Sequence, residues 1–171
     1  MLKLQHAIGF QQDVKNSFLP VTLTHVVLIV GTHAALQNLT TQEMTFLPTG
    51  VENASLGSIQ AMALDSSKRR LVICRGGGIG GATRGNIGQM IVYQLVVTLQ
   101  EKEHLTIERM SVHIACTIQH PSFTVFTAVA FSNDSVLLSC STRGEEDEQL
   151  SGEIFVWDWK RQREYVYIMI M

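Results

Sequence analysis

Short apolar runs recur along the whole chain, and clusters of Ser, Asn, Asp and Gly separate them. The runs are rich in β-branched and aromatic residues, a composition that is typical of β-strands. No long stretch repeats apolar residues at i, i+3, i+4 and i+7 between capping residues, so the pattern does not favour helices. The sequence therefore predicts an all-β protein.

The last third of the chain shows this pattern most clearly. Its strand-like runs are residues 126–132, 136–142, 153–159 and 163–171. Asn133 and Asp134 predict a tight turn after the first run, because both residues tolerate left-handed backbone and hydrogen-bond to it locally. A polar, acidic loop at residues 143–152 follows the second run. We expect four antiparallel strands here.

The first two thirds repeat the order. Strand-like runs in the middle third are residues 58–64, 70–74, 89–95 and 104–110, and runs 25–31, 34–39 and 43–47 take the second, third and fourth places of the first third. Within the third runs, the corresponding segments ALQNL, IVYQL and FVWDW start at residues 35, 91 and 155, so the intervals are 56 and 64 residues. A recurring unit of four antiparallel strands is typical of a β-propeller blade.

We therefore expect one domain over residues 1–171, a partial propeller of about three four-stranded blades. The expected parts are an edge segment at 1–12 and blade-like units at 13–50, 58–110 and 125–171. Common blades have about 40–45 residues. We assign the excess length to loops at 75–88, 96–103, 111–124 and 143–152, because loops tolerate insertions.

One loop contains a motif of dinucleotide-binding enzymes. Gly76, Gly78 and Gly81 spell G-x-G-x-x-G after an apolar run. That motif binds pyrophosphate only where it opens a helix. Gly85 and Gly88 follow within eight residues and disfavour a helix, and the next run prefers a strand. We interpret the segment as a loop between two strands and keep a nucleotide-binding enzyme as the least favoured alternative.

Composition excludes several classes of protein. Of 171 residues, 46 % are hydrophobic and 16 % are charged, which favours a folded domain over a disordered chain. The net charge of −2 gives no basic field for nucleic acid or a membrane surface. No apolar run approaches the roughly 20 residues that span a bilayer. Three cysteines without metal-like spacing suggest reduced thiols in the cytoplasm.

Other chemistry finds little support in the sequence. The six histidines show no H-x-x-x-H spacing, so we predict no metal. No hydrolase elbow G-x-S-x-G occurs, and the acidic run at 145–148 lacks the spacing of a calcium loop. The basic clusters 68–70 and 160–163 fall where turns are expected, and we interpret them as solvated. We predict a protein without catalytic residues or a cofactor.

The last unit resembles a blade of the WD-repeat family, with Trp157-Asp158 as the signature dipeptide. Residues 36–39 and 92–95 replace that dipeptide in the other units, so these two units depart from the family pattern. The opening, over residues 4–74, is similar to the N-terminal propeller of the cilia- and flagella-associated protein 57 family. The matching positions are Gln5, His6, Gly9, Phe10, Asn38, Phe46, Pro48 and Arg69.

This resemblance implies a scaffold of the ciliary axoneme that helps to seat inner dynein arms and regulatory complexes on doublet microtubules, in the cytoskeleton of a cilium or flagellum. The alternative is a WD-repeat adaptor in another cytosolic complex. About three blades do not close a ring of the usual four to eight, so we expect another chain to complete the propeller. Strand addition at residues 1–10 and 163–171 would supply such contacts. The candidate interaction residues are Gln5, His6, Phe10, Tyr165 and Tyr167.

Overall fold

The computed structural model describes residues 14, 16–49, 57–76, 88–102, 105–119, 125–143 and 152–170. Every regular element in these ranges is a strand, which confirms the all-β prediction. The strands are β1 (Phe18–Pro20), β2 (His25–Val30), β3 (His33–Asn38), β4 (Met44–Phe46), β5 (Ile59–Leu64), β6 (Arg70–Arg75), β7 (Gln89–Lys102), β8 (Leu105–Gln119), β9 (Val125–Phe131), β10 (Leu137–Arg143), β11 (Gly152–Asp158) and β12 (Arg163–Ile170).

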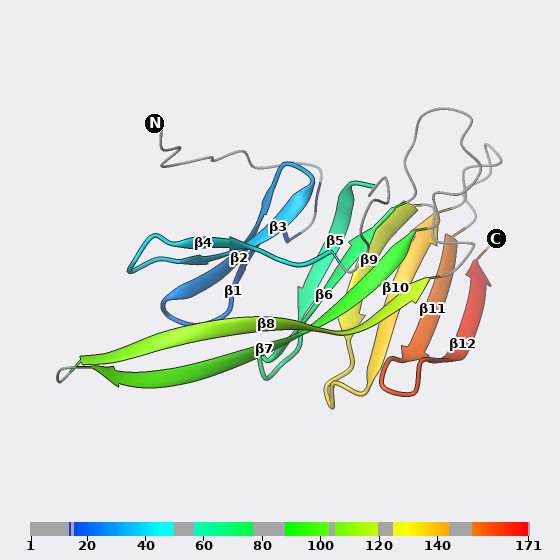
Figure 1. The fold of residues 1–171 in the computed structure, drawn as a ribbon. Coiled ribbons are helices and arrows are strands. Elements are labelled where there is room, and N and C mark those ends of the chain that lie inside the picture. The colour runs from blue at the N-terminus through cyan, green and yellow to red at the C-terminus, as the bar shows by residue number, and fades with distance from the viewer. Residues whose placement is uncertain are drawn as a thin grey trace.

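The strands form three antiparallel sheets of four, and each sheet is built from four consecutive strands (Figure 1). The first sheet contains β1 to β4, the second β5 to β8, and the third β9 to β12. Every neighbouring pair is antiparallel and joined without a crossover. This architecture confirms the expected four-stranded antiparallel units and is consistent with a partial propeller of blade-like sheets.

Two loop predictions were wrong. We expected strands at 89–95 and 104–110 with a loop at 96–103, but β7 and β8 run on as one hairpin of 14 and 15 residues. The segment 111–119, expected to be loop, is the second half of β8. Strand β1 was not predicted, because it has only three residues and ends in Pro20. A proline is tolerated at a strand edge but gives no strand signal.

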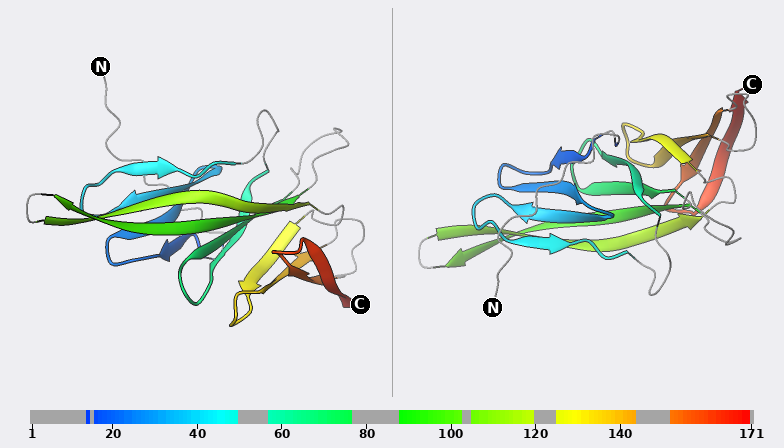
Figure 2. Two further views of the ribbon diagram at one scale, coloured as in Figure 1. Left: turned by 60° about the horizontal axis from the view of Figure 1, so that its bottom comes forward. Right: turned by 90° about the horizontal axis from the view of Figure 1, so that it is seen from above.

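The second sheet lies between the other two, and its alternate residues enter two separate cores (Figure 2). The residues of the second sheet that face the first sheet are Ile59, Met62, Leu71, Ile73, Ile91 and Tyr93. The residues that face the third sheet are Ala61, Val72, Cys74, Met90 and Val92. Neighbouring residues of a strand point to opposite faces, so strands covered on both faces read as continuous apolar runs.

The faces of the second and third sheets correspond position by position. The pair of Val72 and Val92 in the second sheet corresponds to the pair of Ser139 and Val156 in the third, because Val72 and Ser139 are each the third residue of their strand. Both sheets also carry a bulge in their first strand pair, between Ile59 and Ala61 and next to Ser141. The face that packs on the preceding sheet carries large side chains, which in the third sheet are Phe126, Leu138, Phe155 and Trp159. The opposite face carries smaller ones.

Two of the three turns between third and fourth strands are built by one side chain. Asn38 Oδ1 accepts hydrogen bonds from the N–H groups of Thr40 and Thr41 at 2.8 and 3.0 Å. Asp158 Oδ1 accepts the same pair of bonds, from Lys160 and Arg161, at 3.1 Å. Short Asn and Asp side chains stabilise a turn in this way. Asp158 of the signature dipeptide and its counterpart Asn38 therefore stabilise equivalent turns.

The second sheet carries Gln94 at the place of Asn38 and Asp158. In each sheet this residue pairs with the first residue of the second strand, which is His25, Arg70 or Leu137. The first and third sheets turn after it, whereas after Gln94 the ladder of β7 and β8 continues to the pair of Lys102 and Leu105. The Gln side chain is one methylene longer, and Gln is not among the residues that favour turns. The residues after it, Leu95, Val96 and Val97, prefer extended backbone. The hairpin of β7 and β8 therefore continues at the position where Asn38 and Asp158 begin a turn in the other two sheets.

Candidate interaction site between the first and second sheets

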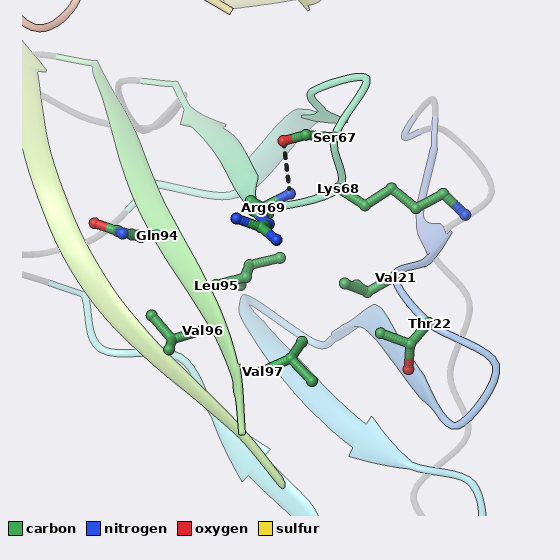
Figure 3. Close-up of a pocket in the computed structure, with 9 residues that line it drawn as sticks. All are labelled: Val21, Thr22, Ser67, Lys68, Arg69, Gln94, Leu95, Val96 and Val97. Carbon is green, nitrogen blue, oxygen red and sulfur yellow. Dashed lines mark hydrogen bonds between the residues drawn. The ribbon is translucent and has the colours of Figure 1, made fainter. Parts of the chain in front are cut away.

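A groove of about 360 Å³ lies where the first and second sheets meet. Three elements line it: the segment after β1 with Val21 and Thr22, the β5–β6 turn with Ser67, Lys68 and Arg69, and strand β7 from Gln94 to Val97 (Figure 3). Lys68 extends from its turn toward the segment after β1, and the side chains of β7 line the opposite wall (Figure 3). The groove therefore has a basic rim and a partly apolar wall.

The β5–β6 turn is held by the buried Asp65 carboxylate. Its Oδ1 accepts hydrogen bonds from the N–H groups of Arg69 and Arg70 at 2.9 Å, and Ser67 Oγ donates to Oδ2 at 2.7 Å. Lys68 takes a left-handed φ of 55° at the tip. Burial raises the pKa of Asp65, but these hydrogen bonds and one from Ser135 outweigh it, so the pKa lies below its ordinary value.

Asp65 is charge-paired with Arg70, whose Nη1 lies 3.3 Å from Oδ2. The other two cations of this turn, Lys68 and Arg69, are exposed, and neither has an acidic partner among the residues the structure describes. Two exposed cations beside an apolar wall give this groove a positive local potential although the chain as a whole is slightly acidic.

The long hairpin is fixed to the first sheet beside this groove. His25 Nδ1 lies 3.2 Å from Glu108 Oε1 of β8, and Thr24 Oγ1 lies 2.9 Å from the same ring nitrogen. Hydrogen bonds from Thr22, Thr24 and His25 lower the pKa of Glu108. Met110, Val112 and Ile114 of β8 pack against the core of the first and second sheets. The base of the hairpin is therefore a firmly held part of the fold.

Beyond this anchor the hairpin extends past the first sheet (Figure 1). Val97 and Leu99 of β7 lie level with the anchor, opposite Met110 and Glu108 of β8, and are 43 % and 68 % exposed. The two side chains lie on one face of β7 beside the groove and form an exposed apolar strip. Val97 and Leu99 were not among the predicted interaction residues. The available signal was the alternation Met110, Val112, Ile114, Cys116 and Ile118, which has the period of a strand.

The junction of the second and third sheets differs from the first junction, because polar groups of the two sheets hydrogen-bond to each other there. Ser135 Oγ donates to Asp65 Oδ2 at 3.0 Å, and Trp159 Nε1 donates to the Ser135 carbonyl at 2.9 Å. Arg70 stacks over the Trp159 ring at 5.4 Å. These contacts join the β5–β6 turn to the β9–β10 turn and to Trp159.

The predicted interaction residues fall in separate places. Gln5, His6 and Phe10 lie outside the described residues. Tyr165 is 67 % exposed on β12, the edge strand of the third sheet. Tyr167 is paired with Phe155 in the same ladder, and its side chain is not described. Neither tyrosine lines the groove described above.

The signature dipeptide has a structural place. Asp158 builds the turn after β11, and Trp157 packs partly buried against the core between the second and third sheets. Residues 77–87 of the glycine loop lie outside the described residues, but the strands on either side, β6 and β7, are antiparallel neighbours. A dinucleotide-binding turn joins parallel strands through a helix, so this connection differs from it.

The three cysteines are part of the packed core. Cys74, Cys116 and Cys140 are free and buried. Burial raises the pKa of Cys116 to about 11 and that of Cys140 to about 12. No group of three His, Cys, Asp or Glu side chains that could hold a metal ion occurs in the described ranges. Within the same ranges the chain has no helix that could cross a bilayer.

The chain has matches among solved structures but none among protein families or curated proteins. No protein-family model matches the chain, and no curated protein matches it. A chain in the crystal structure of a mitotic checkpoint complex aligns with 95 % of this chain and 51 % of its own length, at 13 % identity and a TM-score of 0.37. An auxiliary nutrient binding protein from Bacteroides thetaiotaomicron aligns with 94 % of this chain and 42 % of its own, at 13 % identity and a TM-score of 0.35.

This chain thus spans about half, or less, of the two solved chains it aligns with. TM-scores at this level carry no argument about function. The assignment of the fold rests on the three four-stranded sheets themselves. The similarity of residues 4–74 to the ciliary family stays a prediction from sequence.

Proposed function

We propose that this protein is a non-catalytic interaction module, and that it serves as a scaffold in the ciliary axoneme that helps to dock inner dynein arms and regulatory complexes on doublet microtubules. The axonemal part of the proposal rests on the sequence resemblance. The observation that carries the interaction role is the hairpin of β7 and β8, which replaces a tight turn and presents exposed apolar side chains beside a basic groove.

The groove and hairpin suggest the chemistry of the partner. Val97 lines the groove and Leu99 lies further along the same strand, so an apolar strip leads out of it. Lys68 and Arg69 border that strip with positive charge. A protein segment that combines acidic and apolar side chains matches both features, because opposite charges steer the encounter and apolar contacts hold the complex.

The function is tested by localisation of tagged protein in ciliated cells. The double variant Val97→Thr, Leu99→Thr keeps the strand preference but removes the apolar strip. The matched control, Val97→Ile with Leu99→Ile, keeps both. We expect wild type and control on the axoneme and the Thr variant dispersed in the cytoplasm.

Two results would contradict the proposal in different ways. Wild-type protein that stays off the axoneme would overturn the ciliary assignment and favour an adaptor in another complex. Axonemal protein whose localisation is unchanged in the Thr variant would overturn the role of the hairpin.

A further inference from the structure

Strand β7 runs on past the point where its neighbour β6 begins. The ladder of β6 and β7 ends at the pair of Arg70 and Gln94, whereas β7 continues to Lys102 with β8 paired along its other side. Among the residues that the structure describes, no strand pairs with the β6 side of β7 beyond Leu95. The outer half of β7 therefore has an open edge in line with β6.

One hydrogen bond shows which backbone groups point to this open edge. The Leu95 N–H donates to the Arg69 carbonyl at 2.8 Å, so the backbone groups of Leu95 face the β6 side. Their direction alternates along an antiparallel strand, and the register of β7 and β8 is regular from Leu95 onward. The N–H and C=O groups of Val97, Leu99 and Glu101 therefore point to the open edge and take no part in the ladder with β8.

The groove between the first and second sheets lies along this edge. Its lining contains Lys68 and Arg69 of the turn that precedes β6, and β7 up to Val97. Leu95 and Val97 lie on the side of β7 that faces the segment after β1 (Figure 3). A strand added at the open edge would occupy the groove as a continuation of β6, with alternate side chains directed toward the first sheet.

Charge gives the added strand a direction. Lys68 and Arg69 are exposed at the inner end of the edge, with no acidic partner among the described residues, and Glu101 is exposed toward its outer end. A strand antiparallel to β7 runs in the direction of β6, so its C-terminal end reaches Lys68 and Arg69. Acidic groups at that end meet two cations, whereas acidic groups at the other end meet Glu101.

From the open edge, the groove and the two cations we infer that the partner of this site binds by strand addition. The partner supplies an extended segment that pairs antiparallel with β7 at Val97 and Leu99, carries apolar side chains at alternate positions, and places acidic residues at its C-terminal end beside Lys68 and Arg69. Main-chain hydrogen bonds give affinity, and the side chains give specificity. The inference rests on the proposed interaction role and deepens it by naming the form and direction of the bound segment.

The test measures peptide binding to the purified full chain by fluorescence anisotropy. The first probe is a fluorescein-labelled, amidated peptide of three Val-Thr pairs followed by two aspartates, and the second carries the aspartates at its N-terminal end instead. We expect saturable binding of the first probe and weaker binding of the second. No binding of the first up to about 1 mM would overturn the inference, and equal binding of both would overturn its direction.

Proline variants separate the backbone from the side chains. Leu99→Pro removes an N–H that points to the open edge and spares the ladder with β8, so it should bind the first probe about fivefold more weakly than Leu99→Thr does. Thr106 pairs with Glu101, and its N–H points to the other edge of the hairpin. Thr106→Pro is therefore the matched control and should bind like wild type. Equal affinity of Leu99→Pro and Leu99→Thr would overturn strand addition.

A charge variant tests the end of the groove without changing any strand. Lys68→Gln with Arg69→Gln should weaken binding of the first probe about tenfold. Lys160→Gln with Arg161→Gln removes the same net charge from an exposed turn of the third sheet and should keep wild-type affinity. Equal weakening by both pairs would show attraction by net charge alone and overturn the inference.

Localisation separates a failure of this inference from a failure of the proposed function. Axonemal Leu99→Pro protein, with the Val97→Thr, Leu99→Thr variant dispersed, would overturn strand addition and leave the role of the hairpin standing. Wild-type protein that stays off the axoneme while it binds the first probe would overturn the ciliary proposal alone.

Discussion

The second and third sheets have the same strand order and the same bulge, yet they differ in what covers them. Both faces of the second sheet are buried, and Val72, Cys74 and Met90 fill the core that it shares with the third sheet. At the corresponding places the third sheet has Ser139, Ser141 and Ile154, all partly exposed. The apolar character of a blade position thus depends on whether a sheet lies over it, and not on the strand that carries it.

The largest expected effect comes from placing a charge at one ladder position in each sheet. Val72→Glu buries a carboxylate between two sheets, among the apolar residues of the core that the structure describes there, and should cost several kcal/mol and unfold the chain. Ser139→Glu, at the matching position, should leave the folded state within about 0.5 kcal/mol of wild type. Urea denaturation of the variants checks this. Equal loss at both positions would contradict the assignment of the faces.

The next prediction concerns the carboxylates in the turns of these sheets. The pKa of Asp65 is lowered in the folded state, so folding favours its ionised form. The stabilisation is fully present above the ordinary pKa of 3.8 and is lost as pH falls through the lower folded value. Asp65→Asn should lower stability at pH 7 by about 1–3 kcal/mol and flatten the acid limb of the stability curve.

Asp134, in the matching turn of the third sheet, is the control for that experiment. Its pKa is also lowered, by hydrogen bonds from Ser132 and the Val136 N–H, but the residue is exposed. We expect Asp134→Asn to change stability less than Asp65→Asn at pH 7. Thermal unfolding of both variants between pH 2.5 and 7 gives the answer, and an equal response would show that burial of Asp65 is unimportant.

A smaller effect should follow from changing the turn residue of the third sheet to that of the second. Asp158→Gln removes the short acceptor for the N–H groups of Lys160 and Arg161 and should cost about 1–2 kcal/mol. Asp158→Asn should stay close to wild type, because Asn38 builds the same turn in the first sheet. Chemical denaturation compares the two variants. A Gln variant as stable as wild type would refute our explanation of why the second sheet runs on.

The smallest effect is expected from thiol reagents on the native chain. All three cysteines are buried, and burial raises the pKa of Cys116 and Cys140 to about 11 and about 12, so the reactive thiolate is scarce at pH 8. Ellman's reagent should label none of them within minutes in buffer and all three in urea. Fast labelling of Cys140 in buffer would show that the second and third sheets separate readily.

Much of the fold follows from local sequence. The pair Asn133-Asp134 marks a turn by its side-chain chemistry, and the short apolar runs mark strands, so the three units and the all-β class could be predicted. The length of β7 and β8 could not be predicted from turn residues alone. There the outcome depends on Gln94, which fails to turn the chain, and on packing of Met110 and Ile114 against a distant sheet.

The groove between the first and second sheets could not be predicted from the sequence for a related reason. Lys68 and Arg69 lie on a turn that the sequence does predict, and on that basis they were interpreted as solvated. Their place beside Val97 depends on how two sheets meet, which is a contact between segments far apart in the chain. Local patterns carry no information on such a contact.

The central claim is that adjacent residues of the second sheet point into different cores. Nuclear Overhauser effects between methyl groups test it directly. We predict contacts from Val72 to Leu138 of the third sheet, and from Ile73 to Val27 or Ile29 of the first. Contacts from both residues to a single sheet, or from neither to any other sheet, would contradict the stacked arrangement.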